Sequence, residues 1–403
     1  MRPTPWAPRF PAVGSLLHLR FSRSDFLLKT SRVLGDVYWL DLGADRVLVV
    51  GHPDDAARVL ENQDVYPDKG GNTGFRRISV PFLGGGLSTW NATDPEWRRR
   101  RSAFSRLFRT AKPAEFGLDG LTRLTDGQLR PAIERTIVFD LVTKLLGKQC
   151  KGAEIAVVIG LLRQLAGTFW STKVPGPHPF VGTKTKRATA ALESIVQGWL
   201  EDSPDDSPIK RYVGELSDAQ VRDEVLSQLL SVGTLAVPAE WALQLLAANP
   251  HVQATLRSSR AGSHDDYLTW VVWEVLRHCP STYWIQRRAA RDDELSGASV
   301  RTGDRVTIHV PRVHTHPDFW RDPDRFRPER FGEGLDWKRA WMPFGRGARL
   351  CIGQKYSVDV IKSIVARVVA NYVIGEKPGR AAALVTGFSL VPRPTPSLDF
   401  TPI

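Results

Sequence analysis

Residues 344–353 read FGRGARLCIG and constrain the chain more than any other short segment. They place Cys351 in a glycine-rich loop, with Arg349 two residues before the sulfur. A thiolate is the metal-binding form of cysteine, and a nearby cation or an iron ion keeps it deprotonated. Gly345 and Gly353 have no Cβ, so the backbone can pass close to a flat macrocycle. The pattern predicts a thiolate ligand for haem iron and an arginine that binds a haem propionate.

The spacing in this loop also resembles a family pattern. Five residues match in full the haem-binding pattern of the cytochrome P450 family: Phe344, Gly347, Arg349, Cys351 and Gly353. A buried free cysteine in a glycine turn is the alternative interpretation, because free cysteine is usually a small core residue. The resemblance extends from about residue 5 to the C-terminus. It implies a mainly α fold with small peripheral β-sheets, haem b as cofactor, and Cys351 as the ligand of its iron.

A second constellation supports the resemblance. Glu274 and Arg277 lie three residues apart in a segment that predicts a helix ended by Pro280, so carboxylate and guanidinium share one face. Residues 326–331, FRPERF, are similar to the family's Phe-x-Pro-x-Arg-Phe segment. The resemblance implies that Arg330 joins Glu274 and Arg277 in a buried network. Because burying charge costs desolvation, we expect this network to fix the geometry of the thiolate loop rather than to add stability.

Two more arginines match family positions that bind the haem propionates. Trp97 and Arg101 are similar to the family's Trp-x-x-x-Arg helix, and Arg287 to an arginine that reaches the other propionate from a strand. The alternative for Arg101 is an exposed cation within a run of arginines. After the cysteine, Ser357 and Val360 stand where the family often has alanine and glutamate, so this helix departs from the pattern.

The long apolar helix expected from the N-cap Ser217 to about Ala248 carries the second departure. The family's oxygen-activating motif there is Ala/Gly-Gly-x-Asp/Glu-Thr. An ungapped alignment places residues 230–234, LSVGT, on the motif, because a gap inside a helix would rotate everything beyond it. Thr234 then keeps the alcohol and Gly233 replaces the acid. The alternative role for the Thr234 hydroxyl is a bond to the carbonyl four residues back in its own helix.

Pro238 should open this helix, because it lacks the N–H that would bond the Thr234 carbonyl, which is then free to bind water. Segments expected beside the substrate offer aromatic residues suited to a planar or apolar ligand. The pocket residues predicted on this basis are Trp90, Trp170, Pro238, Tyr283, Trp284 and Phe388. Core packing is the alternative role for each of the aromatic ones.

The whole chain, residues 1–403, is interpreted as one integrated domain, because it contains no convincing linker. Other patterns predict a β-hairpin at 36–50, helices at 52–62 and 94–108, mainly helix at 118–170, a loop at 170–186, strands within 283–311 and a final hairpin at 387–400. Three cysteines cannot all pair, and the N-terminus lacks a signal-peptide pattern, so a cytoplasmic location is expected. The chain has no run of eighteen apolar residues, so no membrane span is expected.

The net charge of +12 favours acidic partners. No nucleic-acid-binding motif accompanies the charge, so nucleic acid is not an expected partner. In the resembled family, the face beside the thiolate docks an acidic electron donor such as a ferredoxin. The basic residues expected there are Arg98, Arg99, Arg100, Arg101, Arg106, Arg109, Arg346, Lys355 and Lys362. For any one of these residues, an ordinary solvent-exposed position with no partner protein is an equally good interpretation.

The resemblance implies a soluble, bacterial-type haem-thiolate oxidoreductase that acts on a small-molecule or peptide substrate from specialised metabolism. Oxygen-dependent hydroxylation or epoxidation with electrons from a ferredoxin is the expected reaction. Loss of the acid at Gly233 raises an alternative: radical coupling of aromatic rings in a peptide or aromatic natural product, or peroxide-driven oxidation. A haem sensor without turnover is a distant alternative.

Overall fold

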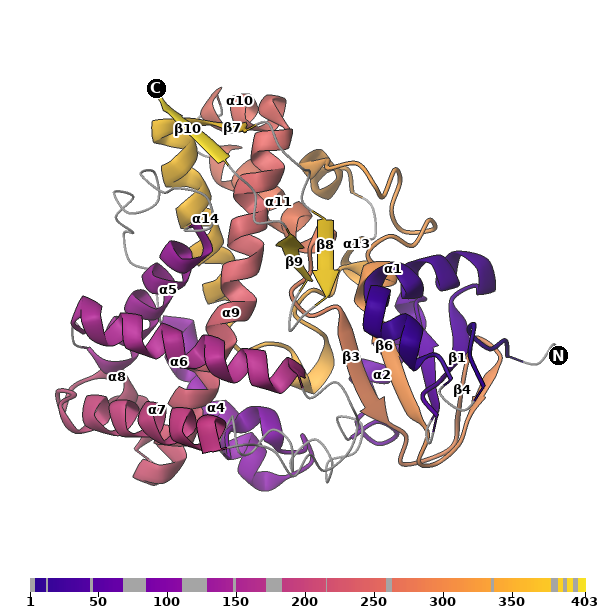
Figure 1. The fold of residues 1–403 in the computed structure, drawn as a ribbon, viewed down its shortest axis with the longest axis horizontal. Helices are drawn as coiled ribbons and strands as arrows, with labels where there is room; N and C mark the ends of the chain where they lie inside the picture. The colour runs from indigo at the N-terminus through magenta and orange to yellow at the C-terminus, as the bar shows by residue number, and fades with distance from the viewer. Residues whose placement is uncertain are drawn as a thin grey trace.

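Helices form one half of the protein, and a small sheet with two covering helices forms the other (Figure 1). The computed structural model describes residues 4–11, 14–43, 46–67, 85–110, 129–147, 150–171, 183–214, 216–258, 263–334, 337–377, 383–386, 390–393 and 398–403. The expected fold class, mainly α with small sheets, is confirmed.

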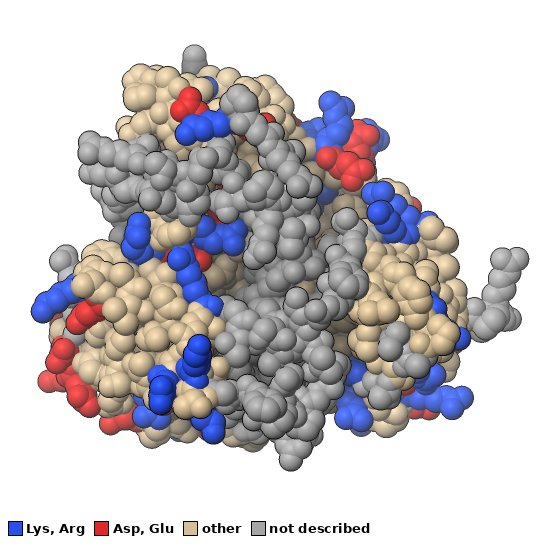
Figure 2. Space-filling view, viewed as in Figure 1, with Lys and Arg blue, Asp and Glu red and all other residues tan. Residues whose placement is uncertain are grey.

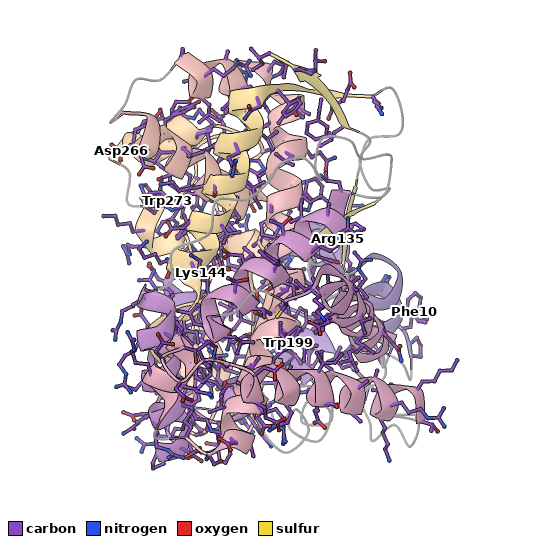
Figure 3. All side chains as sticks on the ribbon, turned by 90° about the vertical axis from the view of Figure 1, so that its left-hand side faces the viewer. Phe10, Arg135, Lys144, Trp199, Asp266 and Trp273 are labelled. Carbon is purple, nitrogen blue, oxygen red and sulfur yellow. The ribbon has the colours of Figure 1, made fainter. Side chains whose placement is uncertain are left out.

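The helical half is built around α9, Asp218–Ala248. Its N-cap Ser217 accepts from the Gln220 N–H, and the Gln220 side chain accepts from the Ser217 N–H, which forms a capping box. The neighbouring helices are α4 (Pro95–Thr110), α5 (Leu129–Leu146), α6 (Gly152–Ser171), α7 (Thr183–Glu201), α8 (Pro208–Val213), α10 (Pro250–Ser258), α11 (Ser263–His278) and α14 (Gln354–Asn371). Side chains fill the space between them, including the buried Trp199 of α7 (Figure 3).

Among the described helices, α9 alone is long and apolar enough to cross a membrane. However, 72% of its most apolar window is buried inside the protein. Most of its length packs against α5, α7, α11 and α14 in the largest apolar cluster. Burial on this scale is what the core helix of a folded domain requires.

The sheet half has a four-stranded sheet in the order β1-β2-β6-β3. Its strands are β1 (Val37–Asp41), β2 (Arg46–Val50), β3 (Trp284–Arg288) and β6 (Arg305–His309). Strands β1 and β2 are antiparallel, β2 and β6 are parallel, and β3 and β6 are antiparallel. One face packs on α1 (Leu16–Leu34) and the other on α2 (Pro53–Glu61). The hairpin expected at 36–50 and the helix expected at 52–62 are thereby confirmed.

Shorter elements complete the described structure. They are the two-stranded sheets β4 (Asp293–Leu295) with β5 (Ala298–Val300), β7 (Tyr372–Glu376) with β10 (Leu398–Pro402), and β8 (Ala383–Thr386) with β9 (Leu390–Arg393), the helices α12 (Val310–Val313) and α13 (Trp337–Ala340), and the 3₁₀ turns η1 (Leu87–Thr89), η2 (Pro328–Gly332) and η3 (Gly347–Arg349).

Two expectations need correction. The final hairpin at 387–400 is wrong, because β9 pairs with β8 while β10 pairs with the distant β7. Pro392 removes a donor from β9, and such a strand can pair fully along one edge only. The loop expected at 170–186 is shorter, because α6 continues to Ser171 and α7 begins at Thr183. Residues 118–128 and 172–182 lie outside the described part of the chain.

The Glu274 network forms as expected and is almost fully buried. The Arg277 Nε donates to one carboxylate oxygen at 2.8 Å, and the Arg330 Nε donates to the other at 3.0 Å. Arg277 also donates to the His314 carbonyl at 2.9 Å. His314 Nδ1 lies 3.0 Å from the Arg277 carbonyl, and its Nε2 accepts from the Met342 N–H at 3.0 Å. The network therefore reaches the segment that leads into the thiolate loop.

A second buried carboxylate lies on α9. Glu224 is inaccessible to solvent, and one of its oxygens lies 3.3 Å from the Arg100 Nη1. Arg100 also donates to the Gly85 carbonyl at 2.8 Å and to Glu96 at 2.6 Å. Burial raises the pKa of Glu224 to about 7, against the lowering effect of the Leu87 N–H and of Arg100. Arg100 thus ties α4, the residues before η1, and α9 together.

We predict that Glu274→Gln lowers the free energy of unfolding by about 3–5 kcal/mol, because it leaves two buried guanidinium groups without their carboxylate. Urea unfolding of both proteins measures the difference. Glu333→Gln is the matched control, since Glu333 pairs with Arg327 at 2.8 Å but is 39% exposed, and such pairs contribute about 0–1 kcal/mol. Equal losses in the two variants would contradict the prediction.

We predict that Glu224→Gln gains stability relative to the natural protein as pH rises from about 5 to about 8. The folded protein raises the Glu224 pKa from 4.5 to about 7, so it binds this proton more tightly than the unfolded chain does. Stability from this group is therefore present at low pH and lost as pH rises through the folded pKa. Thermal unfolding of both proteins across this range is the measurement. A difference that does not change with pH would refute the raised pKa.

Candidate functional site

The loop before α14 has the backbone that its glycines allow. Gly345 and Gly347 have φ of +73° and +69°, a region that side chains with a Cβ rarely adopt. A Cβ on Gly347 would also lie 2.4 Å from the Leu60 carbonyl oxygen at the end of α2. The Cys351 N–H donates to the Phe344 carbonyl at 3.1 Å, which closes the loop. Cys351 is thus presented by a turn that is held against α2.

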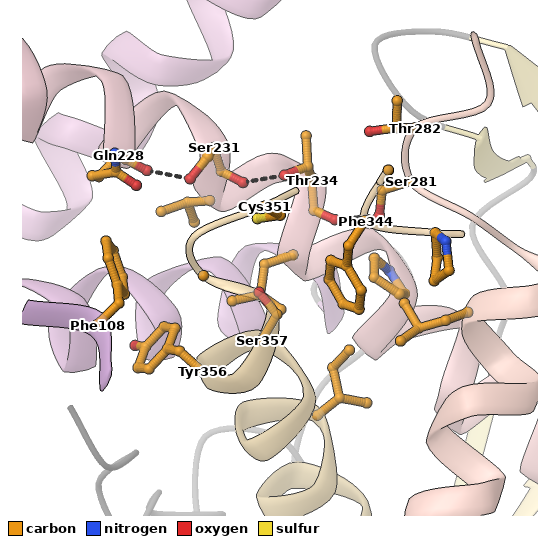
Figure 4. Close-up of a pocket in the computed structure, with 18 of the residues that line it drawn as sticks. Phe108, Gln228, Ser231, Thr234, Ser281, Thr282, Phe344, Cys351, Tyr356 and Ser357 are labelled. Atoms are coloured by element: carbon orange, nitrogen blue, oxygen red, sulfur yellow. Dashed lines mark hydrogen bonds between the residues drawn. The ribbon is translucent and has the colours of Figure 1, made fainter. Parts of the chain in front are cut away.

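Cys351 lies in the wall of a cavity of about 320 Å³ between α9 and this loop (Figure 4). Its surface is accessible from this cavity although protein surrounds most of the thiol, whereas Cys150 and Cys279 are buried. The cavity is lined by Phe108, Ile137, Leu141, Gln228, Ser231, Val232, Thr234, Leu235, Pro238, Leu276, Ser281, Thr282, Ile285, Arg287, Pro343, Phe344, Gly345, Arg346, Arg349, Cys351, Gly353, Tyr356, Ser357 and Ile361. Apolar walls with a few polar groups are typical of a cofactor site.

The protein around the sulfur by itself favours the neutral thiol, and a bound metal ion would convert it to a thiolate. Burial raises the pKa of the Cys351 thiol, while a hydrogen bond from the Gly353 backbone and the charge of Arg101 lower it. A bound metal ion displaces such a proton outright. Arg287, Arg346 and Arg349 also line the cavity and supply positive charge for an anionic group. The residues present therefore fit an iron porphyrin with acidic side groups.

Arg101 and Arg349 both contact the indole of Trp97, and of these two arginines Arg349 lines the cavity. The guanidinium carbons of Arg101 and Arg349 lie 5.2 Å and 5.5 Å from the ring centroid of Trp97. Arg101 donates to the Leu350 carbonyl at 2.5 Å, and Arg349 donates to the Trp90 carbonyl. Arg101 and Trp97 are thus placed against the thiolate loop, and their contact with a propionate stays a prediction.

On α9 the structure places Thr234 in the cavity wall, whereas Gly233 is not among the lining residues described. The Thr234 hydroxyl donates to the Ser231 carbonyl at 2.6 Å, which is the bond to its own helix considered above, made three residues back (Figure 4). Ser231 and Leu235 also line the cavity. The face of α9 that borders the cavity therefore includes these residues as well as Thr234. A Cβ on Gly233 would meet no atom within 4 Å.

The carbonyl released by Pro238 has a partner other than the expected water. Helix α9 continues through Pro238, and the Ser281 hydroxyl donates to the Thr234 carbonyl. Ser281 lies between α11 and β3 and lines the cavity too. The side-chain bond replaces the lost backbone bond and joins two walls of the cavity.

The predicted substrate residues are scattered. Pro238 lines the cavity. Trp90 donates its indole N–H to the Gly85 carbonyl at 2.6 Å and packs near Trp97, and Tyr283 is buried. Trp284 packs on the opposite face of the sheet, toward α1, because Ile285 next to it faces the cavity and side chains alternate along a strand. The Trp170 side chain and Phe388 lie outside the described residues.

Several apolar lining residues were missed by sequence reasoning, among them Phe108 of α4, and Ile137 and Leu141 of α5. Nothing in an apolar helical pattern separates a cavity wall from a packed core. Ser281 was also missed. Its position just after Pro280 placed it in a turn, but its partner is 47 residues earlier in the chain.

Comparisons with known proteins agree with this geometry. A family model described as Cytochrome P450 matches residues 3–120 and 199–399. "Pentalenene oxygenase" of Streptomyces avermitilis is 25% identical over 403 residues, covering 87% of this chain and 88% of that protein. "Costunolide synthase" of Cichorium intybus is 23% identical over 427 residues, covering 91% and 85%.

A third relative matches a shorter part. "Putative cytochrome P450 137" of Mycobacterium tuberculosis is 28% identical over 192 residues, which is 47% of this chain but only 40% of that protein. The chain thus spans well under two thirds of that relative's length. The family model nevertheless covers most of the chain, including the loop that holds Cys351. The chain therefore belongs to the cytochrome P450 family, and its mainly α architecture with small sheets is the fold of that family.

Proposed function

We propose that this protein is a haem-thiolate monooxygenase that binds haem b in the cavity beside Cys351 and oxidises a small organic molecule. The observation that carries the proposal is the Cys351 sulfur in one wall of a cavity whose facing wall is α9, with Thr234 on it. Haem iron supplies the binding and reductive activation of oxygen. The chain supplies the thiolate, the shape of the pocket and the control of water.

Arg287 and Arg349 are our candidates for the haem propionates, because both line the cavity, Arg287 from strand β3 and Arg349 from the turn η3 just before Cys351. Arg101 and Trp97 support the same region from α4. Phe344, which also lines the cavity, would pack against the ring. We treat residues 1–403 as one domain that forms this single site.

Electrons would come from an acidic ferredoxin-type donor at the basic face near the thiolate loop. Arg98 and Arg109 of α4 are exposed and suited to such contacts. Arg100 is not, because it is buried and bonded to Glu96 and Glu224. On the face drawn in Figure 2, lysine and arginine side chains lie over both halves of the molecule, as expected for a strongly basic surface. A cytoplasmic location fits such a donor.

The Thr234 hydroxyl would position the proton that oxygen activation needs. It lines the cavity opposite Cys351, and its present bond to the Ser231 carbonyl leaves the oxygen able to accept. Gly233 offers no carboxylate beside it, so the proton must arrive through water in the cavity. Ser231, which is exposed and lines the cavity, marks the side from which water reaches Thr234.

The substrate class follows from the mostly apolar cavity walls, which favour an apolar or aromatic specialised metabolite. Two relatives matched over most of this chain are named an oxygenase and a hydroxylase, which supports hydroxylation or epoxidation. The missing acid at Gly233 favours a second candidate, radical coupling of aromatic rings or peroxide-driven oxidation. Product mass separates the two, because oxygenation adds oxygen and coupling removes hydrogen.

We predict that the purified protein, reduced under carbon monoxide, gives the difference spectrum of a thiolate-ligated haem, and that Cys351→Ala abolishes it. The loss should be complete, since no other described cysteine lines the cavity. Cys150→Ala, which alters a buried cysteine elsewhere, should keep the spectrum. A nitrogen-ligated spectrum, or none after supply of haemin, would refute the proposed function and favour a protein without this chemistry.

We predict that Thr234→Ala lowers the product formed per oxygen consumed by about tenfold or more, because positioned proton transfer contributes about 10²-fold or more to such steps. Oxygen uptake and product are measured together with ferredoxin, its reductase and a turned-over substrate. Thr269→Ala is the matched control, because Thr269 also bonds its own helix, at 2.7 Å, but lies on α11 and is not among the residues that line the cavity. Full coupling in Thr234→Ala would show that another group does this work.

A further inference from the structure

Ser357 occupies the first turn of α14, immediately after the thiolate loop. Its N–H donates to the Gly353 carbonyl at 2.8 Å, so the turn is regular there. Ser357 lines the same cavity as Cys351, and Figure 4 shows Ser357 at the start of α14 and Cys351 on the loop before it. In the family pattern this position often holds alanine, so the hydroxyl is a property of this chain.

Gly353 leaves the space between the hydroxyl and the sulfur open. Side chains on a helix lean toward its N-terminus, so the Ser357 side chain covers the turn that starts at Gly353. The place that a Cβ would take on Gly353 lies 3.9 Å from the Cys351 sulfur and 3.9 Å from the Ser357 hydroxyl oxygen. Both groups therefore lie near this one position, and Gly353 has no side chain that would occupy it.

The Ser357 hydroxyl makes no hydrogen bond to any residue that the structure describes, although it is partly buried. The other serines of the cavity behave differently. Ser231 donates to the Gln228 carbonyl at 2.6 Å, and Ser281 donates to the Thr234 carbonyl. A serine within a helix usually bonds the carbonyl four residues back, here that of Gly353, and Ser357 does not. Its proton remains available for an acceptor in the cavity.

We propose that the Ser357 hydroxyl donates a hydrogen bond to the Cys351 thiolate when haem iron is bound, and thereby raises the reduction potential of the iron. The inference rests on the proposed function, because it requires iron on Cys351. A thiolate that accepts hydrogen bonds pushes less electron density onto the iron, and this stabilises the ferrous state. The Gly353 N–H already donates to this sulfur, so Ser357 would be a second donor. Ser357 is thus a positioning and tuning residue and does not touch substrate.

The test is the haem reduction potential of the haem-loaded protein, measured by spectroelectrochemical titration without substrate. Ser357→Ala should lower the equilibrium constant for reduction by about three- to tenfold, and tenfold is about 59 mV for one electron. Ser357→Thr and Ser357→Val have the same shape but differ in the hydroxyl. We expect the threonine variant to stay near the natural potential and the valine variant to fall with Ser357→Ala. Ser363→Ala, on the same helix but away from the cavity, should change nothing.

Each outcome separates this inference from the proposed function. If the natural protein lacks the thiolate spectrum with carbon monoxide, the proposed function fails first. If that spectrum is intact and Ser357→Ala keeps the natural potential, the inference alone is wrong. If Ser357→Ala loses haem, the Ser357→Thr and Ser357→Val variants test the inference instead. Equal haem reduction potentials in those two variants would overturn the inference. Loss of haem from all three would assign Ser357 a packing role and overturn it too.

Discussion

The carboxylate of Glu274 is the interaction on which the site depends. It accepts from Arg277 and Arg330 in a region closed to solvent, and it is the shared partner that lets both guanidinium groups be buried. Arg277 continues through His314 to the Met342 N–H, and the Met342 carbonyl accepts from Gly345. A charge buried in α11 therefore fixes the entry of the thiolate loop. Removing these charges from water costs free energy, so the network is better explained by its positioning of the thiolate loop than by added stability.

Sequence reasoning predicted the parts of the protein that depend on fixed spacing. The loop around Cys351, the Glu274–Arg277 pair and the N-cap Ser217 follow from residue types a few positions apart. The hairpin β1–β2 is of the same kind, since its strands are joined by a short turn. Arg330, which is 56 residues from Glu274, was expected only from the family resemblance. The Cys351 loop, the Glu274–Arg277 pair, the N-cap and the hairpin needed no knowledge of distant contacts.

What sequence reasoning could not predict depends on partners far along the chain. Ser281 bonds a carbonyl on α9, and Glu224 bonds Arg100 of α4, and neither pairing has a local signature. Sequence reasoning also could not tell which face of the sheet Trp284 occupies. Its aromatic side chain suggested a pocket residue, but Ile285 next to it faces the cavity, so Trp284 lies on the opposite face, toward α1. The tail strands β9 and β10 entered different sheets for the same reason.

The Ser281–Thr234 bond has a mechanical consequence. It fastens the middle of α9 to the turn that begins β3, so these two walls, which carry Thr234 and Arg287, behave as one rigid frame. If a larger molecule is to bind, the cavity therefore has to widen on the side formed by α4 and α5. Phe108, Ile137 and Leu141 on that side are apolar and can repack without breaking a polar contact. Those three side chains would accordingly determine which size of molecule binds, while the walls formed by α9 and β3 would determine its orientation.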